Sequence, residues 1–379
     1  MAARVTSSRL IGRTAELAEL SALLEEAAGG RPALAFVAGE SGVGKTRLVA
    51  ELERGADSLV LHGDCVELGE GELPYAPLVG ALRPLAREGD PVLAELPELA
   101  PLLPELAAPG AQASDQGRLF EALLGLLDRL GRREPVLLVL EDIHWADRAT
   151  SAFLAFLARA LDTERVLTVA TYRTDELHRR HPLRPLLAEL ERGPRTRRVE
   201  LAPLTREELA AALEDIAGAA PEPILLDRLY ARSEGNPLFA EELLAAGADG
   251  RGALPPTLRD ALILRTERLS AGAQDLLRVL AVAGRADHAL LAEVAGLDAR
   301  ELREALRETV AGHVIVVDGD RHEFRHALLR EVVHDDLLPG ERAELHLALA
   351  RALEARDGGA WVSAAIAHHY NGAGDQPAA

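Results

Sequence analysis

The stretch VAGESGVGKTRLVAEL, residues 37–52, restricts the fold more than any other part of the sequence. It satisfies G-x-x-x-x-G-K-[ST] directly after an apolar run and directly before a helical pattern, which is the context of a phosphate-binding P-loop. In such a loop backbone N–H groups and a helix N-terminus surround the phosphates, the lysine reaches the terminal phosphates, and the threonine hydroxyl binds Mg²⁺. We therefore predict a site for ATP or ADP with Mg²⁺ at Gly39, Glu40, Ser41, Gly42, Val43, Gly44, Lys45, Thr46 and Arg47.

Two acids, Glu141 and Asp142, end the apolar run VLLVLED. A P-loop ATPase needs a carboxylate near Mg²⁺ and a polar group that orients the attacking water. We assign Glu141 to the Mg²⁺ shell and Asp142 to the water, although the order is inverted relative to the commoner Asp-Glu, so which acid faces the metal stays open. The predicted metal ligands are Thr46, Glu141 and Asp142. The alternative is a pair of solvated loop acids, which is disfavoured because burying acids without a metal or donors is costly.

A further polar residue, Arg173, ends the run RVLTVATYR. If its strand lies next to the strand that carries Glu141, the guanidinium is beside the phosphate loop and can bind a γ-phosphate through two hydrogen bonds. We count Lys45, Glu141, Asp142 and Arg173 as the catalytic candidates. The alternative is that Arg173 pairs with a nearby acid, Asp175 or Glu176.

Five short β-like runs in the first two hundred residues begin at Ala33, Ser58, Pro135, Arg165 and Arg197. Segments with helical periodicity separate them. Near-continuous apolar strands that alternate with helices predict a parallel sheet covered on both faces. We expect an α/β P-loop domain over residues 1–203, with three layers and five strands. The Pro-rich tract over residues 72–110 has regularly spaced leucines, which predict short packed helices.

The rest of the sequence has helical patterns and one hairpin. Thr205 and Glu208 fit a capping box that opens a helix. Three helical patterns near residues 271–283, 288–295 and 299–310 precede HVIVVDGDRHEFRH, whose two alternating runs flank a tight Asp-Gly turn. Three helices followed by a hairpin describe a winged helix. We expect an all-α helical domain over 204–253, a winged-helix domain over 254–338 and a helical segment over 339–379.

The composition argues against several classes of protein. A formal charge of -19 opposes non-specific attraction to nucleic acid or an anionic membrane. The second and third helices of the predicted winged helix mix acids with arginines, so we expect no direct DNA binding by this chain. The single cysteine, Cys65, excludes an internal disulfide and a Cys-based zinc site. No apolar run approaches the roughly 20 residues of a membrane span, and a cytoplasmic location is expected.

Six motifs occur in an order that resembles a known family: LIGRTAEL, GESGVGKT, VLEDIHWAD, TYRTDEL, RSEGNPLFAEEL and FRHALLREVVHDDLLPGER. Together they resemble the signal-transduction ATPases with numerous domains, the STAND class, and most of all the N-terminal ATPase module of large LuxR-type bacterial transcriptional regulators. The resemblance extends over nearly the whole chain. It implies that an α/β domain, a small helical domain and a winged-helix domain close over one nucleotide, and that residues 339–379 begin a TPR-like repeat array.

The resemblance also assigns residues in the N-terminal half to the nucleotide. It implies that Ile11, Gly12 and Arg13 lie near the adenine and ribose, and that Arg173 has the phosphate-sensing position.

In the second half, the resemblance implies that Pro237 packs on the base and that His326 touches the β-phosphate of ADP. A proline offers a flat apolar face with a fixed φ, and a histidine can donate to a phosphate. The plainer alternatives are that Asn236 and Pro237 begin a helix and that His326 is an ordinary helix-start histidine. Whether Arg173 and His326 sense ATP or ADP is left open.

By resemblance, the expected function is a nucleotide-gated switch with weak ATPase activity. ADP would hold the domains closed, and ATP would open them and promote self-association, with an inducer or partner protein that the sequence does not identify. Two other classes remain as alternatives. One is an autonomous P-loop ATPase or kinase, although the motifs supply no separate substrate base. The other is a protein-interaction module that binds nucleotide only for stability, in which case a variant without Lys45 keeps its partners.

Overall fold

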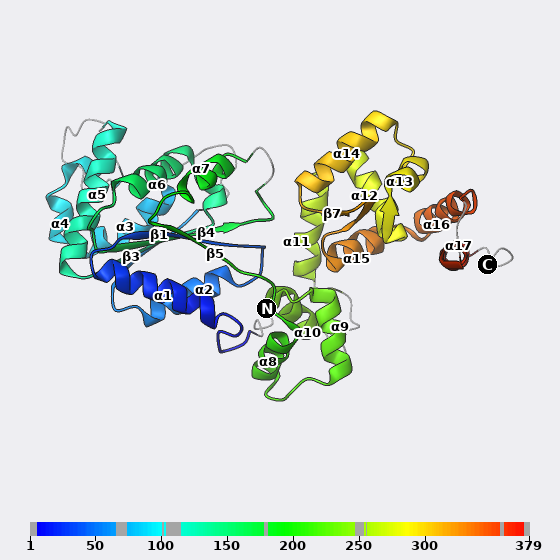
Figure 1. Cartoon of the computed structure of the whole chain (residues 1–379), viewed down its shortest axis with the longest axis horizontal. Helices are drawn as coiled ribbons and strands as arrows, with labels where there is room; N and C mark the ends of the chain where they lie inside the picture. Colours follow the sequence, from blue (N-terminus) through cyan, green and yellow to red (C-terminus); the bar gives the residue numbers. More distant parts are fainter. Residues whose placement is uncertain are drawn as a thin grey trace. The chain divides into compact units, whose positions relative to one another are not determined.

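The computed structural model describes residues 6–65, 74–100, 102–103, 115–177, 181–246, 254, 256–356 and 360–374. The chain divides into two units (Figure 1). The N-terminal unit is Ser7–Leu204, and the C-terminal unit contains Thr205–Ala379 together with the first six residues. Within the described ranges no helix is both long and apolar enough to cross a membrane.

A parallel sheet of five strands forms the centre of the N-terminal unit, in the order β2-β3-β4-β1-β5. The strands are β1 (Ala33–Gly39), β2 (Leu59–Asp64), β3 (Val136–Glu141), β4 (Val166–Arg173) and β5 (Thr196–Glu200). β1 and β3 are buried along their whole length, as their continuous apolar runs require when helices cover both faces. The predicted five-stranded P-loop sheet is confirmed, and β4 lies next to β3 as the Arg173 prediction needs.

Two layers of helices cover the sheet (Figure 1). Alternate strand residues face different layers. In β1, Ala35 and Val37 pack with α1 (Thr14–Ala28) and α2 (Lys45–Gly55). Leu34 and Phe36 face the other layer. The helices of that layer are α3 (Ala76–Glu88), α5 (Gln116–Arg133), α6 (Arg148–Ala160) and α7 (Leu183–Leu190). Both cores therefore hold the same central strand in place.

The described part of the Pro-rich tract packs on the sheet as expected. It forms α3, the short helix α4 (Pro91–Ala94) and the single turn η1 (Pro97–Leu99). Leu93 and Leu99 are buried in the core with α5. Residues 72–73, 101 and 104–110 of the tract lie outside the described residues.

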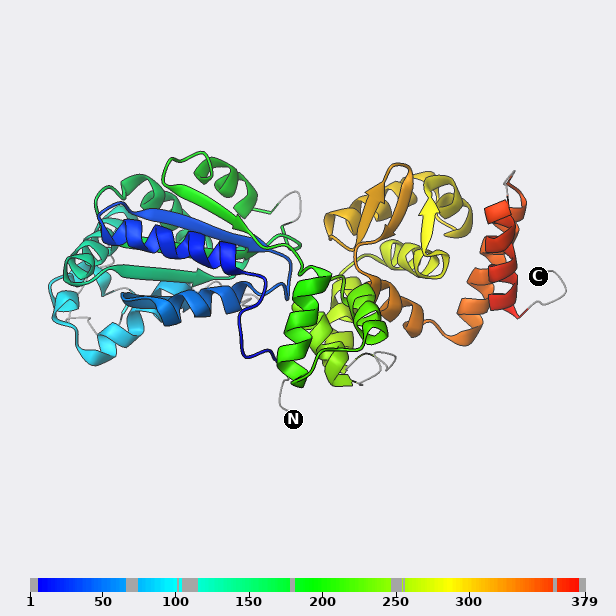
Figure 2. The same cartoon turned by 60° about the horizontal axis from the view of Figure 1, so that its bottom comes forward.

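The C-terminal unit begins with helices and continues into a winged helix (Figure 2). Thr205 and Glu208 form the predicted capping box, because each backbone N–H donates to the other side chain, at 2.8 and 3.3 Å. The helices are α8 (Arg206–Ala217), α9 (Pro223–Ser233), α10 (Pro237–Ala246), α11 (Pro256–Glu267), α12 (Ala271–Ala283), α13 (His288–Val294), α14 (Ala299–Ala311), α15 (Ala327–Asp336), α16 (Pro339–Glu354) and α17 (Ala360–Ala373).

The winged helix has one strand more than the sequence predicted. β7 (Ile315–Asp318) and β8 (Arg321–Phe324) form the predicted hairpin, and β6 (Arg285–Asp287) pairs with the other side of β8. The expectation of a hairpin as the sole β-structure here was therefore wrong. A strand of three residues with only one apolar side chain, Ala286, has too short a pattern to be recognised, and its pairing with β8 makes it a strand. The domain boundaries predicted at 253/254 and 338/339 stay predictions.

Candidate nucleotide-binding site

The predicted P-loop joins the end of β1 to the start of α2. Gly42 and Gly44 have φ of 80° and 105°, in the left-handed region that favours glycine. α2 begins at Lys45, so the N–H groups of its first turn have no partner within the helix and its positive end points at the loop. No atom lies within 4 Å of the position that a Gly44 Cβ would take. Backbone donors with open space beside them suit the binding of a phosphate group.

The Lys45 ammonium is held inside the loop. Its Nζ donates to the carbonyl oxygens of Gly39 and Glu40, at 2.9 and 2.8 Å. Burial lowers the pKa of Lys45 to about 8, and the nearby carboxylate of Asp175 works in the opposite direction. An anionic phosphate would stabilise this buried cation, because a buried charge is costly unless an opposite charge compensates it.

Thr46 and Glu141 are brought together, as the sequence predicts for a magnesium site. The Thr46 hydroxyl donates to Glu141 Oε2 at 2.5 Å. Glu141 is the last residue of β3 and is 5% exposed. Burial raises the pKa of Glu141, and the Thr46 hydrogen bond lowers it in part. A hydroxyl and a carboxylate at this spacing are hard oxygen donors, which Mg²⁺ prefers.

Arg173 stands beside the loop and holds two acids. It pairs in register with Gly39 across β1 and β4. Its Nη2 lies 3.4 Å from Asp142 Oδ2, and its Nη1 donates to Glu176 Oε1 at 2.7 Å. Asp142 has φ 54°, and its N–H donates to Thr171 Oγ1 at 2.9 Å, which fixes the turn after β3. Arg173 thus pairs with Glu176, as the alternative expects. It also lies beside the loop, as a phosphate-sensing role requires.

Two contacts of this network were not predicted. Asp175 is 3% exposed, and its Oδ1 accepts the Ser41 N–H at 3.1 Å, so a buried carboxylate supports the P-loop backbone. His144, in the turn η3 (Ile143–Trp145), is buried with its Nε2 3.3 Å from Glu176 Oε2. Against the effect of burial, His144 and Arg173 hold the pKa of Glu176 at about 2. The sequence signal that could have found Asp175 and His144 is their position just after β4 and β3, because the carboxyl ends of neighbouring parallel strands meet at one edge.

The segment before α1 is tied to the loop through arginines. Arg13 is buried, and its Nη2 donates to the carbonyls of Ala202 at 2.6 Å and Val43 at 3.2 Å. Arg47 donates to the carbonyls of Ser7 and Arg9, the latter at 2.7 Å. Both side chains therefore make contacts that position the loop.

These contacts put Arg13 close to the P-loop. Contact of Ile11, Gly12, Arg13 and Arg47 with a nucleotide stays a prediction.

Pro237 and His326 both belong to the C-terminal unit. Pro237 opens α10, and Asn236 Oδ1 accepts the Leu238 N–H at 3.1 Å, so the helix-start alternative is realised. His326 precedes α15; its Nδ1 lies 3.1 Å from Glu234 Oε2 and its ring packs against Phe239 at 6.1 Å between centroids. The fold thus brings the start of α10 and His326 together. Their contact with a nucleotide stays a prediction.

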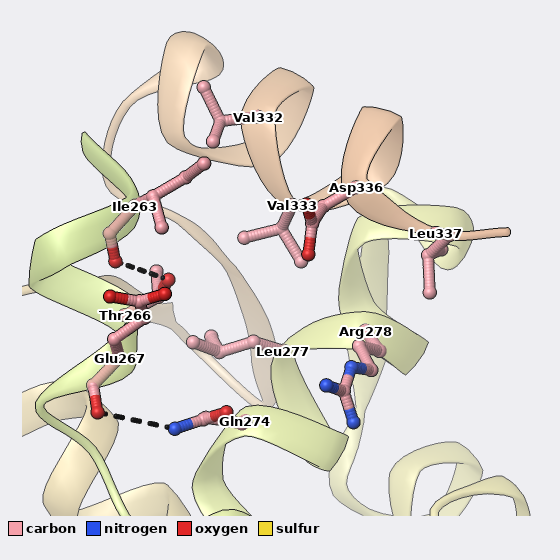
Figure 3. Close-up of a pocket in the computed structure, with 10 residues that line it drawn as sticks. All are labelled: Ile263, Thr266, Glu267, Gln274, Leu277, Arg278, Val332, Val333, Asp336 and Leu337. Carbon is pink, nitrogen blue, oxygen red and sulfur yellow. Dashed lines mark hydrogen bonds between the residues drawn. The ribbon is translucent and has the colours of Figure 1, made fainter. Parts of the chain in front are cut away.

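A separate small pocket lies in the C-terminal unit between α11, α12 and α15 (Figure 3). Thr266 donates to the Ile263 carbonyl at 2.8 Å and Gln274 to the Glu267 carbonyl at 3.3 Å, so its polar groups are engaged (Figure 3). Its volume of about 150 Å³ is below the roughly 300–1,000 Å³ of ordinary ligand pockets. It is therefore too small to hold a nucleotide.

Comparisons with known proteins agree with this geometry. Residues 9–169 match the model of the AAA ATPase domain family. An uncharacterized protein of Rhizobium meliloti (strain 1021) is 26% identical over 422 residues, which cover 96% of this chain and 39% of that protein. The chain thus spans well under half the length of this curated relative.

Two solved structures resemble the chain as a whole. A Walker-type ATPase of Pyrococcus abyssi has a TM-score of 0.58 at 17% identity, covering 86% of this chain and 96% of that one. A Signal Transduction ATPase with Numerous Domains (STAND) protein with a tetratricopeptide repeat sensor, from Pyrococcus horikoshii, has a TM-score of 0.43 at 16% identity, covering 98% and 50%. The family match over residues 9–169 identifies the N-terminal unit as containing a nucleotide-binding P-loop ATPase domain of the AAA type.

Proposed function

We propose that this chain is a nucleotide-gated signal-transduction switch that hydrolyses ATP slowly, rests closed with ADP, and opens or self-associates with ATP. The observation that supports this most is the position of Arg173. It lies in register with the first P-loop glycine, Gly39, and at the same time holds Asp142 and Glu176. A guanidinium can exchange carboxylate oxygens for phosphate oxygens in the same planar geometry.

Such an exchange would couple the phosphate to the protein. A γ-phosphate that binds Arg173 competes with Asp142, which is the residue that turns the chain after β3, and with Glu176, which also contacts His144. ATP and ADP would then favour different arrangements of this edge of the sheet. A ligand shifts an equilibrium only by its differential affinity for two states, and the γ-phosphate supplies that difference here.

The residues present fit a magnesium nucleotide. Thr46 and Glu141 would hold the ion, Asp142 would orient the attacking water, and Lys45 would bind the terminal phosphates. When bound, Mg²⁺ would neutralise charge that develops on the phosphate oxygens. Slow hydrolysis is expected if rearrangement of the switch, and not the chemical step, limits turnover.

The proposal extends to the C-terminal unit and to a larger assembly. Pro237 would pack on the base, and His326 would leave the Glu234 carboxylate for the β-phosphate of ADP. We further propose that the chain is the regulatory module of a LuxR-type transcriptional regulator, controlled by an inducer or partner protein. This finer proposal rests on the order of the sequence motifs, and DNA binding would reside outside this chain.

The first test identifies the resting nucleotide. The purified protein is denatured, and released nucleotide is identified by ion-pair chromatography for the parent and for Lys45→Ala. Near-stoichiometric ADP from the parent, lost in the variant, is the expected result. An empty site combined with rapid multiple-turnover ATP hydrolysis would overturn the switch proposal and favour an autonomous ATPase.

The second test asks whether Arg173 distinguishes the two nucleotides. Limited proteolysis of the parent should give different fragment patterns with ATP and with ADP. Arg173→Ala should still bind ADP and lose this difference. Arg198→Ala is the matched control, because Arg198 lies on β5 and pairs with Glu191 and Glu200, whereas Arg173 pairs with Asp142 and Glu176. A difference that survives in Arg173→Ala as fully as in the control would contradict the proposed coupling.

A further inference from the structure

Three histidines meet between the last two helices of the C-terminal unit. α16 and α17 pack side by side (Figures 1 and 2). His346 lies on α16, and His368 and His369 lie on α17. One ring nitrogen from each histidine lies within 4.8 Å of the other two. Neither the P-loop nor the predicted roles of Pro237 and His326 involve this cluster.

The His346 ring lies close to the backbone of α17 at Gly372. A Cβ at Gly372 would lie 2.7 Å from the imidazole, closer than real contacts allow, so a side chain at this position would displace the ring. The ring of His346 lies 5.1 Å from that of His369 and 5.8 Å from that of His368, between centroids. The close helix approach therefore brings all three rings to one point.

The state and exposure of the rings suit metal coordination. His346 and His369 are buried, and His368 is exposed, which leaves a route from solvent. An imidazole ring binds a metal ion through a neutral nitrogen. Neutral imidazole is a preferred ligand of zinc, copper and nickel, and three protein nitrogens with one open position form a known tetrahedral arrangement.

The distances require only a small adjustment. His346 Nδ1 and His369 Nδ1 are 2.9 Å apart, which lets one ring donate to the other. Two nitrogens on a tetrahedral ion with metal–nitrogen bonds of about 2.0–2.1 Å are roughly 3.3 Å apart, so the pair must separate by about half an ångström. A hydrogen-bonded pair needs only two rings, and it does not account for the third ring, His368, at the same point.

We propose that His346, His368 and His369 form a site for a divalent transition-metal ion of the zinc class, which clamps α16 to α17. The ion replaces the hydrogen bond between His346 and His369, and solvent completes its coordination on the side of His368. This site is independent of the proposed nucleotide switch, because its three ligands lie outside the P-loop and the strand-end acids.

The test is a Zn²⁺ titration by calorimetry of the full chain, free of any affinity tag, after removal of metals with a chelator. Excess Mg²⁺ and no added nucleotide keep the hard oxygen donors of the P-loop from competing. The parent should bind one equivalent of Zn²⁺. His369→Asn and His368→Asn should each weaken binding by at least about 10-fold. His288→Asn replaces an exposed histidine of α13 and should bind Zn²⁺ as the parent does.

Two further measurements distinguish loss of metal binding from misfolding of a variant. His368 is exposed, so its variant should keep the helical circular dichroism of the parent while it loses affinity. Substitution with Co²⁺ should give visible d–d bands of a four-coordinate ion in the parent and none in His346→Asn. No Zn²⁺ uptake by the parent, or unchanged affinity in both the His368 and the His369 variants, would overturn the proposal.

Discussion

Gly63 in β2 is the position where the structure tolerates a side chain least. A Cβ placed on Gly63 would lie 1.9 Å from the carbonyl oxygen of Pro77 and 2.7 Å from its carbonyl carbon. Both atoms are backbone in the first turn of α3, so no rotamer change can relieve the contact. Gly63→Ala must therefore push α3 away from the sheet, next to the strand pair that ends in Asp64 and Glu141.

The size of the effect follows from that collision. Inserting one methylene into a packed core commonly costs 1–3 kcal/mol, and a backbone contact of this kind lies at or beyond the upper end, at about 3 kcal/mol or more. For a unit of the size of Ser7–Leu204, this corresponds to a fall of about 6–12 °C in melting temperature. Gly125, in the middle of α5, is the matched control, since nothing lies within 4 Å of its Cβ position. Gly125→Ala should gain about 1 kcal/mol of helix propensity and melt slightly higher.

The assay uses fluorescence that reports the N-terminal unit alone. The chain has two tryptophans, Trp145 and Trp361, and Trp145 packs against a hydrophobic core of the N-terminal unit. In a Trp361→Phe background, thermal unfolding is followed through Trp145 for the parent, Gly63→Ala and Gly125→Ala. If Gly63→Ala melts with the parent, or if both alanine variants lose the same stability, the packing argument is wrong.

Three further predictions concern single side chains. Tyr172 is buried, and burial raises its pKa to about 12, so its contribution to stability is present below about pH 10 and is lost as the pH rises to about 12; alkaline urea titrations should show a loss of roughly 2–3 kcal/mol that Tyr172→Phe abolishes. Burial likewise raises the pKa of the Cys65 thiol to about 12, so Ellman's reagent at about pH 8 should react with the unfolded chain and hardly with the native one; rapid native labelling would contradict this. Thr205→Ala should cost about 1 kcal/mol through loss of the capping box, and Thr205→Ser should restore most of it in thermal unfolding by circular dichroism.

The parts of the fold that the sequence predicts are those with a local physical cause. β1 and β3 are apolar along their length because both faces are buried, and that pattern alone located them. Helix caps such as Thr205 with Glu208 are also local. β6 was missed because its three residues become a strand only through hydrogen bonds with β8, which is distant in sequence.

The candidate site also has parts that the sequence predicts and parts that it does not. The loop and the strand-end acid were predictable, since adjoining parallel strands end at one edge, and Thr46 does meet Glu141. The support of Ser41 by Asp175 and the contact of His144 with Glu176 were not, because they depend on the left-handed turn at Asp142 and on side-chain packing. No residue spacing encodes those details.

The Arg13 guanidinium has a mechanical consequence. It grips the carbonyl of Val43, in the middle of the P-loop, and the carbonyl of Ala202, three residues before the second unit begins at Thr205. A displacement of the loop would therefore pull on residues 202–204 directly, without passing through the sheet. We therefore expect Arg13 to transmit a movement of the phosphate-binding loop to the segment that joins the two units.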